Sequence, residues 1–171
     1  GPRHREDWQV RIAMVKAMGQ FRDEQAGPAL TRLIRDEDER VSEEAILAVG
    51  LIGYRPAFPT LSSMFRSSFD DDIREQTLQS IALMREPDAV TLFESLLESR
   101  EDKERELAVE GLARLEYDAS GFAVRMGEED DANVRLAMVF ALVPTGEPSY
   151  MQMLVDALDT RRSNQAEVYL Y

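Results

Sequence analysis

One phrase recurs along the chain at a nearly constant step. Residues 10–19 read VRIAMVKAMG, and residues 134–143 read VRLAMVFALV. Related segments start at Val41, Ile73 and Glu104, so successive copies are separated by 31, 32, 31 and 30 residues. A constant period of this size is typical of a solenoid, in which each unit is too small to bury its own apolar face and stacks on its neighbours.

Each copy predicts a helix, a turn and a second helix. In the first copy the apolar residues follow helical spacing, and we expect them to form a buried stripe behind an N-cap at Asp7: Val10, Ala13, Met14, Ala17 and Met18. A segment with helix breakers follows the first helix of each copy: RDEQAGP, GYRPAFP, REPD, YDASG and PTGEP. After the first three turns apolar residues resume helical spacing: Leu30, Leu33 and Ile34, then Leu61, Met64 and Phe65, then Phe93, Leu96 and Leu97.

A small side chain occupies the seventh position after the start of every copy. These residues, the small-residue column, are Ala17, Ala48, Ser80, Gly111 and Ala141. Small side chains at one position of successive helices allow the helices to approach closely. The column therefore predicts that the first helices of neighbouring repeats pack against one another.

The period predicts an all-α fold, a right-handed α-solenoid of about five antiparallel helix pairs. We expect residues 1–5 to be a tail, because Gly1-Pro2 resembles the remnant of a cleaved purification tag, and residues 6–171 to form a single repeat domain. The expected repeats span 7–37, 38–68, 69–100, 101–129 and 130–160, and 163–171 would begin a sixth. An incomplete sixth helix would expose apolar residues, so we expect a longer protein or self-association through this C-terminal end.

Three copies begin with the pattern D-x-x-V-R or its close variant, at Val10-Arg11, Ile73-Arg74 and Val134-Arg135. Together with the small-residue column, this pattern resembles HEAT-like repeats in the short form found in bacterial and bilin-lyase-type proteins. The resemblance implies a scaffold that binds a partner in its concave groove. Ser42 and Glu104 depart from the pattern in the second and fourth copies.

Composition narrows the function further. The 33 acidic and 20 basic residues give a net charge of −13, which would repel a nucleic-acid backbone. There is no cysteine, and the single histidine, His4, lies in the expected tail, so the sequence favours a non-catalytic role without a cofactor or metal. No apolar run approaches the roughly 20 residues of a membrane span. The compartment stays open, because a native leader could have been removed.

Charged residues recur in two further patterns. Arg11, Arg74, Arg105 and Arg135, the arginine column, are expected to form a polar ladder that fixes the register between repeats, and a ligand-binding ladder is the alternative. Acidic clusters occupy 36–39, 70–72, 101–104 and 128–131. These clusters could cap the helices that follow them, or they could line up as an acidic ridge for a basic partner.

In HEAT-like proteins the second helices line the concave face, and their exposed positions predict a partner-binding surface. The projected residues are Arg32, Arg35 and Arg66, followed by Glu94, Glu98, Glu128, Asp156 and Asp159. This segregation of charge predicts a protein partner whose acidic part meets the first two repeats and whose basic part meets the later ones. The alternative is a lyase-like or chaperone role towards a bound chromophore or cofactor. Trp8 is expected to cover the N-terminal end of the stack, with a partner contact as the alternative.

Overall fold

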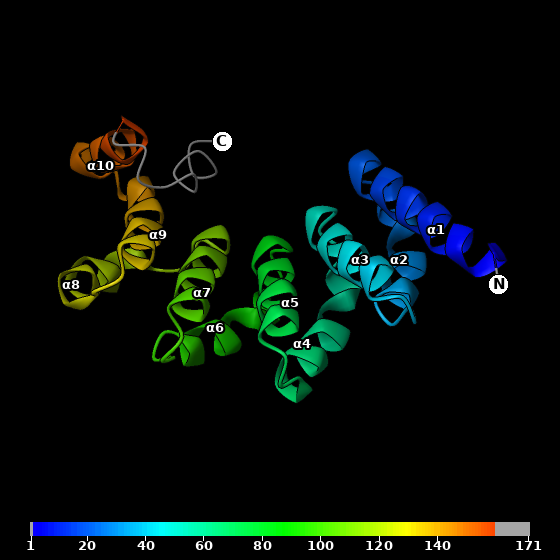
Figure 1. Ribbon diagram of the computed structural model, residues 1–171. Helices are drawn as coiled ribbons and strands as arrows, with labels where there is room; N and C mark the ends of the chain where they lie inside the picture. The colour runs from blue at the N-terminus through cyan, green and yellow to red at the C-terminus, as the bar shows by residue number, and fades with distance from the viewer. Residues whose placement is uncertain (1, 160–171) are drawn as a thin grey trace. The chain divides into compact units, whose positions relative to one another are not determined.

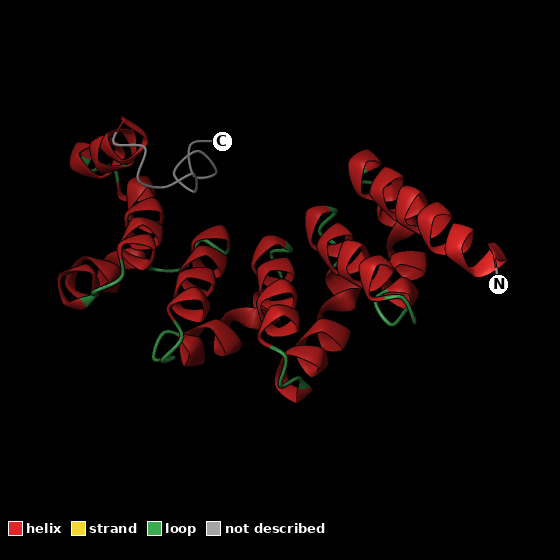
Figure 2. Cartoon of the chain, viewed as in Figure 1, coloured by secondary structure: helices red, strands yellow, loops and turns green. Residues whose placement is uncertain are grey.

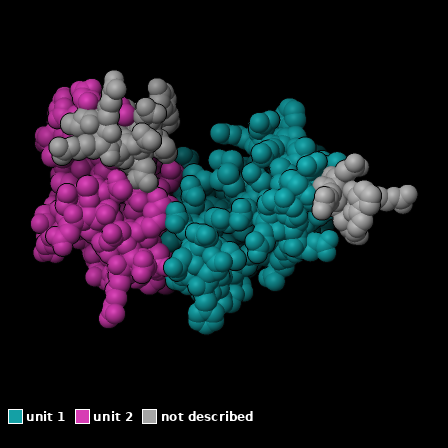
Figure 3. Space-filling model, in the orientation of Figure 1, with its two compact units in different colours: residues 1–89 teal, residues 90–171 magenta. Residues whose placement is uncertain are grey.

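The computed structural model describes the backbone of residues 2–159 and the side chains of residues 7–159. This part of the chain contains ten α-helices and no strand (Figure 2), and the architecture is the all-α solenoid that the period predicts. The expected sixth helix at 163–171, and the self-association predicted there, lie outside the described residues. The chain divides into two compact units, Gly1–Ala89 and Val90–Tyr171 (Figure 3), and each is described separately below.

Helices alternate in two classes along the chain. The first helices are α1 (Pro2–Phe21), α3 (Glu39–Leu51), α5 (Asp71–Leu83), α7 (Asp102–Arg114) and α9 (Ala132–Leu142). The second helices are α2 (Gly27–Leu33), α4 (Phe58–Ser67), α6 (Val90–Leu96), α8 (Phe122–Glu128) and α10 (Pro148–Asp159). A 3₁₀ turn connects each first helix to the second helix that follows it.

Aspartates from the acidic clusters cap three of the first helices. The side chain of Asp38 accepts a hydrogen bond from the backbone N–H of Arg40 at 2.9 Å. Asp70 and Asp131 do the same at the starts of α5 and α9. Each cap satisfies backbone donors that have no partner within the helix.

The first helices all end at a residue with positive φ. These residues are Arg22, Gly53, Arg85, Glu116 and Gly146, and they recur at the same 31-, 32-, 31- and 30-residue steps as the copies. A left-handed residue redirects the last carbonyl groups of a helix. The first four of these residues precede the 3₁₀ turn, whereas Gly146 follows it. Only two of the five are glycine, so the recurrence of the turn is not visible from glycine spacing alone.

In the first unit the helices α1, α3 and α5 lie side by side (Figure 1). The second helix α2 packs against α3, and α4 packs against α5. Each second helix therefore covers the first helix of the next repeat. Leu30, Leu61 and Phe65 of the second helices are buried, as their spacing predicts.

Two members of the small-residue column, Ala48 and Ser80, lie where first helices touch. A Cβ atom placed on Gly19 of α1 would lie 3.4 Å from the Cβ of Ala48, and one on Gly50 of α3 would lie 2.9 Å from the Cα of Ser80. Ser80 also donates a buried hydrogen bond from Oγ to the carbonyl of Ile46. The predicted close approach is confirmed, and it depends on a second small position, at Gly19 and Gly50, that was not part of the prediction.

The face that α1 buries differs from the predicted stripe. Val10 is 57% exposed and Met14 is 56% exposed, whereas Val15 is fully buried. The prediction was wrong because α3 packs on the side of α1 that carries Val15 and Gly19. The helix also begins at Pro2, within the expected tail, so Asp7 lies inside it and is not the N-cap.

Trp8 is half-buried and contacts α3. The guanidinium carbon of Arg40, on α3, lies 3.4 Å from the centroid of the Trp8 ring. The indole therefore contributes a cation–π contact between α1 and α3. The expectation that Trp8 covers the N-terminal end of the stack stays a prediction.

In the second unit α6 packs against α7, and both α8 and α10 pack against α9 (Figure 1). Helices α7 and α9 also contact each other. Phe93 of α6 is buried against Gly111 of α7, where any Cβ atom would collide with the phenyl ring. Gly111 is therefore the member of the small-residue column that makes room for a large side chain of a second helix.

Candidate partner-binding surface

Two members of the arginine column form ion pairs with the segment that leads into the next first helix. In the first unit the Nη2 of Arg11 donates to Asp36 at 3.2 Å, and its Nε lies 3.1 Å from the other carboxylate oxygen. In the second unit Arg105 donates to Glu129 through Nε at 3.0 Å and through Nη2 at 2.9 Å. Asp36 and Glu129 each stand two residues before an N-cap, so both pairs join one first helix to the start of the next.

The same column also binds the end of the preceding second helix. Arg74 donates from Nη1 to the carbonyl of Phe65 at 2.8 Å, and Arg105 donates to that of Ser99 at 2.9 Å. Arg135 donates to the carbonyl of Glu129 at 2.6 Å. The exception in the sequence pattern, Ser42, donates from Oγ to the carbonyl of Ile34. A shorter side chain thus reaches an equivalent acceptor.

These contacts shift the pKa values of the groups involved. The hydrogen bonds from Arg105 lower the pKa of Glu129, and they raise that of Arg105 itself. The hydrogen bond from the Arg40 side chain lowers the pKa of Asp38 to about 2. Both carboxylates are held in the ionised form, and their oxygens already accept hydrogen bonds within the fold.

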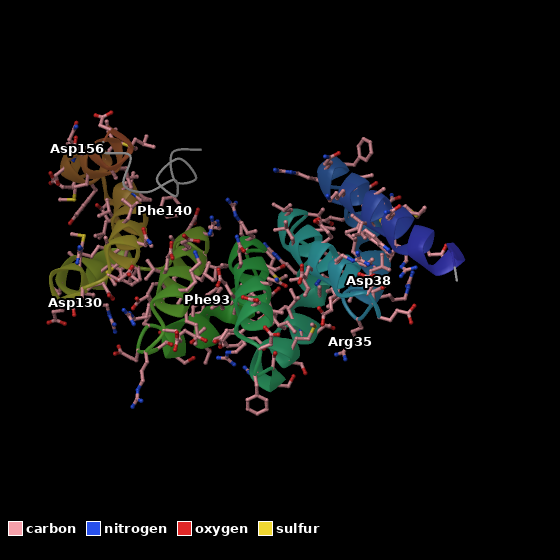
Figure 4. The ribbon with its side chains drawn as sticks, in the orientation of Figure 1. Arg35, Asp38, Phe93, Asp130, Phe140 and Asp156 are labelled. Carbon is pink, nitrogen blue, oxygen red and sulfur yellow. The ribbon has the colours of Figure 1, made fainter. Side chains whose placement is uncertain are left out.

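The predicted basic residues are all exposed and lie in the first unit. Arg32 is in the last turn of α2, Arg35 follows that helix (Figure 4), and Arg66 is in the last turn of α4. No hydrogen bond or ion pair engages any of the three guanidinium groups within residues 7–159. Their five N–H donors each are therefore available to a partner.

The predicted acidic residues lie in the second unit and are also exposed. Glu98 forms an ion pair with Arg125 of α8 at 2.8 Å, and Glu94 accepts a hydrogen bond from the hydroxyl of Tyr117 at 3.1 Å. That hydrogen bond raises the pKa of Tyr117. Asp156, labelled on α10 in Figure 4, accepts a hydrogen bond from Gln152 at 2.8 Å.

Two predicted acids come together at a hollow of about 280 Å³ in the second unit, between the ends of α6 and α8. Glu98 and Glu128 line this hollow with Arg105, Arg125 and Glu129. Arg125 was not part of the predicted surface. Arg125 stands as far before the N-cap Asp131 as Arg32 stands before the N-cap Asp38. Alignment of the two second helices on these N-caps could therefore have predicted Arg125 as a surface residue. The hollow is thus of mixed charge, not purely acidic.

A second hollow, of about 360 Å³, lies in the first unit between α1 and α3. Its floor contains Gly19 and Ala48, and its wall contains Leu47 and Leu51, which are 40% and 42% exposed. The close approach of the helices through small residues leaves this groove open above them. None of the predicted site residues lines it.

One buried carboxylate escaped the sequence analysis. The Glu106 side chain on α7 is 3% exposed, and its Oε2 lies 3.2 Å from the Nζ of Lys103. Burial raises the pKa of this carboxyl group. The equivalent position is Ile12 in the first copy and Leu136 in the fifth, but glutamate also occurs there at exposed positions in the second and third copies. The repeat pattern therefore gives no clear signal of burial.

Two further properties bear on function. In the part of the chain that the structure describes, no cluster of three or more histidine, aspartate or glutamate side chains is arranged to hold a metal ion. Across the same residues, no helix has both the length and the apolar character needed to cross a bilayer.

The geometry defines an α-helical repeat protein in which, within each unit, neighbouring first helices pack on one another and charged side chains tie a first helix to the start of the next. Residues 3–82 match the family model of HEAT repeats, and this match supports a HEAT-like repeat protein. HEAT repeats commonly serve as scaffolds for protein interaction, through the extended surfaces that stacked repeats create. Comparison with curated proteins gives no match.

Proposed function

We propose that the chain is a non-catalytic scaffold that binds an acidic segment of a partner protein through Arg32, Arg35 and Arg66. The observation that carries this proposal is the difference between these arginines and the arginine column. Arg11 and Arg105 are committed to carboxylates of the fold, whereas the three projected arginines are exposed and have no such partner among the described residues. A guanidinium group presents a planar fork that matches a carboxylate through two hydrogen bonds.

Helix stabilisation explains only part of this arrangement. Arg32 and Arg66 lie in the last turns of α2 and α4, where a positive charge favours the negative end of the helix dipole. Arg35 lies beyond α2, and the dipole interaction leaves the N–H donors of all three side chains unused. An acidic partner would engage these donors directly.

The acidic half of the predicted surface supports a secondary role. Glu98 is already paired with Arg125, so a basic partner group would have to displace that arginine. Glu128 and Asp159 are exposed and have no ion pair within the described chain. We therefore assign the main recognition to the first unit and a weaker contact with basic groups to the second.

The proposal is tested by reversing three charges in two matched ways. The variant Arg32→Glu/Arg35→Glu/Arg66→Glu changes the proposed surface, and the variant Arg22→Glu/Arg55→Glu/Arg85→Glu makes the same charge change at three exposed arginines in the turns. Binding of a fluorescein-labelled peptide of alternating Glu and Leu residues is measured by anisotropy at several salt concentrations. We expect the first variant to weaken binding by about tenfold or more and to flatten its salt dependence.

Equal weakening by the two variants would mean that only net charge matters, and it would overturn the proposal. Affinity capture from native lysate with the same two variants extends the test to natural partners, since proteins lost only with the first variant support the scaffold. Visible absorbance of the captured material separates the alternative function. A coloured eluate that both variants retain would favour a role towards a chromophore.

A further inference from the structure

A hollow of about 390 Å³ in the first unit is lined by residues of three consecutive turns. Glu24 lies in the turn after α1, residues 52–56 follow α3, and Met84 and Arg85 follow α5. None of the residues of the proposed partner-binding surface lines this turn hollow. It is therefore a separate feature of the first unit.

Two guanidinium groups in the turn hollow are not engaged by the fold. Arg55 and Arg85 line it, both are exposed, and neither forms a hydrogen bond or an ion pair within residues 7–159. Glu24 is the third charged residue of the lining, so two positive charges stand against one negative charge. The hollow is thus positively charged in a chain whose net charge is −13, and this charge favours an anionic ligand.

An aromatic ring forms a fixed wall of the same hollow. The ring of Tyr54 packs on the backbone of Gly27 at the start of α2, where any Cβ atom would collide with it. Tyr54 also lines the hollow, together with the buried side chains of Ile52 and Met84. A preformed aromatic and apolar wall beside two cationic groups suits a ligand that has a flat ring and an anionic group.

We propose that the turn hollow binds a small ligand in which a phosphate monoester is joined to a planar ring. Arg55 and Arg85 donate hydrogen bonds to the phosphate oxygens, and the ring packs against Tyr54. A phosphate monoester carries nearly two negative charges at neutral pH and three acceptor oxygens, so it matches two guanidinium groups better than a single carboxylate does.

This site goes beyond the proposed scaffold function. The acidic peptide that tests the scaffold contains neither a phosphate nor a ring, so failure of its binding and failure of this proposal are distinguishable. A nucleoside monophosphate and a phosphotyrosine side chain both have the required chemistry, and the experiment separates these two sources.

Isothermal titration calorimetry with phenyl phosphate tests the chemistry of the ligand. We expect one phenyl phosphate to bind per chain. Inorganic phosphate lacks the ring, and benzoate lacks the second charge, so each is expected to bind at least about tenfold more weakly. No binding of phenyl phosphate overturns the proposal, and so does equal affinity for either of the other two anions.

The variant Arg85→Gly separates binding from stability. Arg85 has φ of +57°, a conformation that glycine adopts without strain. We therefore expect Arg85→Gly to weaken the binding of phenyl phosphate about tenfold or more without lowering the unfolding midpoint. The matched control is Arg22→Gly, because Arg22 has φ of +49° at the equivalent position of the first repeat and does not line the turn hollow.

The control variant should bind phenyl phosphate like the wild type. Unchanged binding by Arg85→Gly, or an equal loss in Arg22→Gly, overturns the proposal. Titration with adenosine monophosphate and with a phosphotyrosine peptide then identifies the source of the ligand. Tighter binding of the nucleotide than of phenyl phosphate assigns the site to a free nucleotide, and tighter binding of the peptide assigns it to a modified protein. Weaker binding of both than of phenyl phosphate overturns the proposal.

Discussion

At the scale of single residues, Arg105 shows how one side chain can join three segments. Its guanidinium group donates to Glu129 just before α9, to Asp102 in its own helix and to the carbonyl of Ser99 at the preceding turn. Both members of the Arg105–Glu129 pair are largely buried. A buried pair resists screening by salt, and removal of one partner leaves the other with unsatisfied hydrogen bonds.

The variant Glu129→Gln should therefore destabilise the protein by about 1–3 kcal/mol at neutral pH. Arg105 lowers the pKa of Glu129 in the folded state below its ordinary value of 4.5. Its contribution is present above that value and is lost as the pH falls through the lowered pKa. Urea denaturation at a series of pH values should show the full difference between variant and wild type at pH 7 and a difference that shrinks as the pH falls below 4.5.

The neighbouring Glu128 supplies the control. Its side chain is exposed and does not pair with Arg105, so Glu128→Gln should change the free energy of unfolding by less than about 0.5 kcal/mol. Equal losses in the two variants would show that the effect is one of general charge and not of the ion pair.

At the scale of helices, the residues with positive φ near the ends of the first helices recur at the same steps as the apolar residues. Gly53 ends α3 with φ of +70°, a conformation in which a Cβ atom is strained. We expect Gly53→Ala to cost about 1 kcal/mol. Gly121 has φ of −65° and no atom within 4 Å of an added Cβ, so Gly121→Ala should be neutral or stabilising. Thermal denaturation of the two variants measures the difference, and equal midpoints would contradict this account.

Contacts between first helices give a second prediction at this scale. Ala48→Leu adds three carbon atoms where α3 meets Gly19 of α1, and overpacking should destabilise the protein by about 1–3 kcal/mol. Ala123→Leu makes the same change at an exposed position of α8 and should have little effect. An unchanged unfolding midpoint for Ala48→Leu would show that the two helices can separate without cost.

The repeat period was sufficient to predict the helices and their turns, because the same spacing of apolar residues and helix breakers occurs in each of the five copies. It failed at α1, where Val10 and Met14 resemble their buried equivalents but no described helix lies against them. An apolar repeat pattern predicts which face of a helix can pack against another helix, but it does not predict whether a helix lies against that face. The pairing of Glu98 with Arg125 was missed for a related reason, since it depends on side chains of two different second helices.

At the scale of the whole molecule, the net charge of −13 opposes the compact state. Screening by salt should relieve this repulsion, and the unfolding midpoint should rise by roughly 2–4 °C for each kcal/mol relieved. Thermal scans in increasing NaCl test this, and KCl should act alike if screening is the cause. A midpoint that falls with salt would show that the ion pairs between repeats outweigh the overall repulsion.

The packing of α1 on α3 also affects how the chain can fold during synthesis. The contact between α1 and α3 needs no residue beyond Leu51, and α2 lies between them in the chain. Local contacts of this kind close early, so the nascent chain can bury its first apolar residues while later codons are still being read. An arrest peptide placed at successive distances after Leu51 should register a pulling force well before residue 89 has left the ribosome. Folding would then proceed during translation, and each new helix would pack against helices that have already folded.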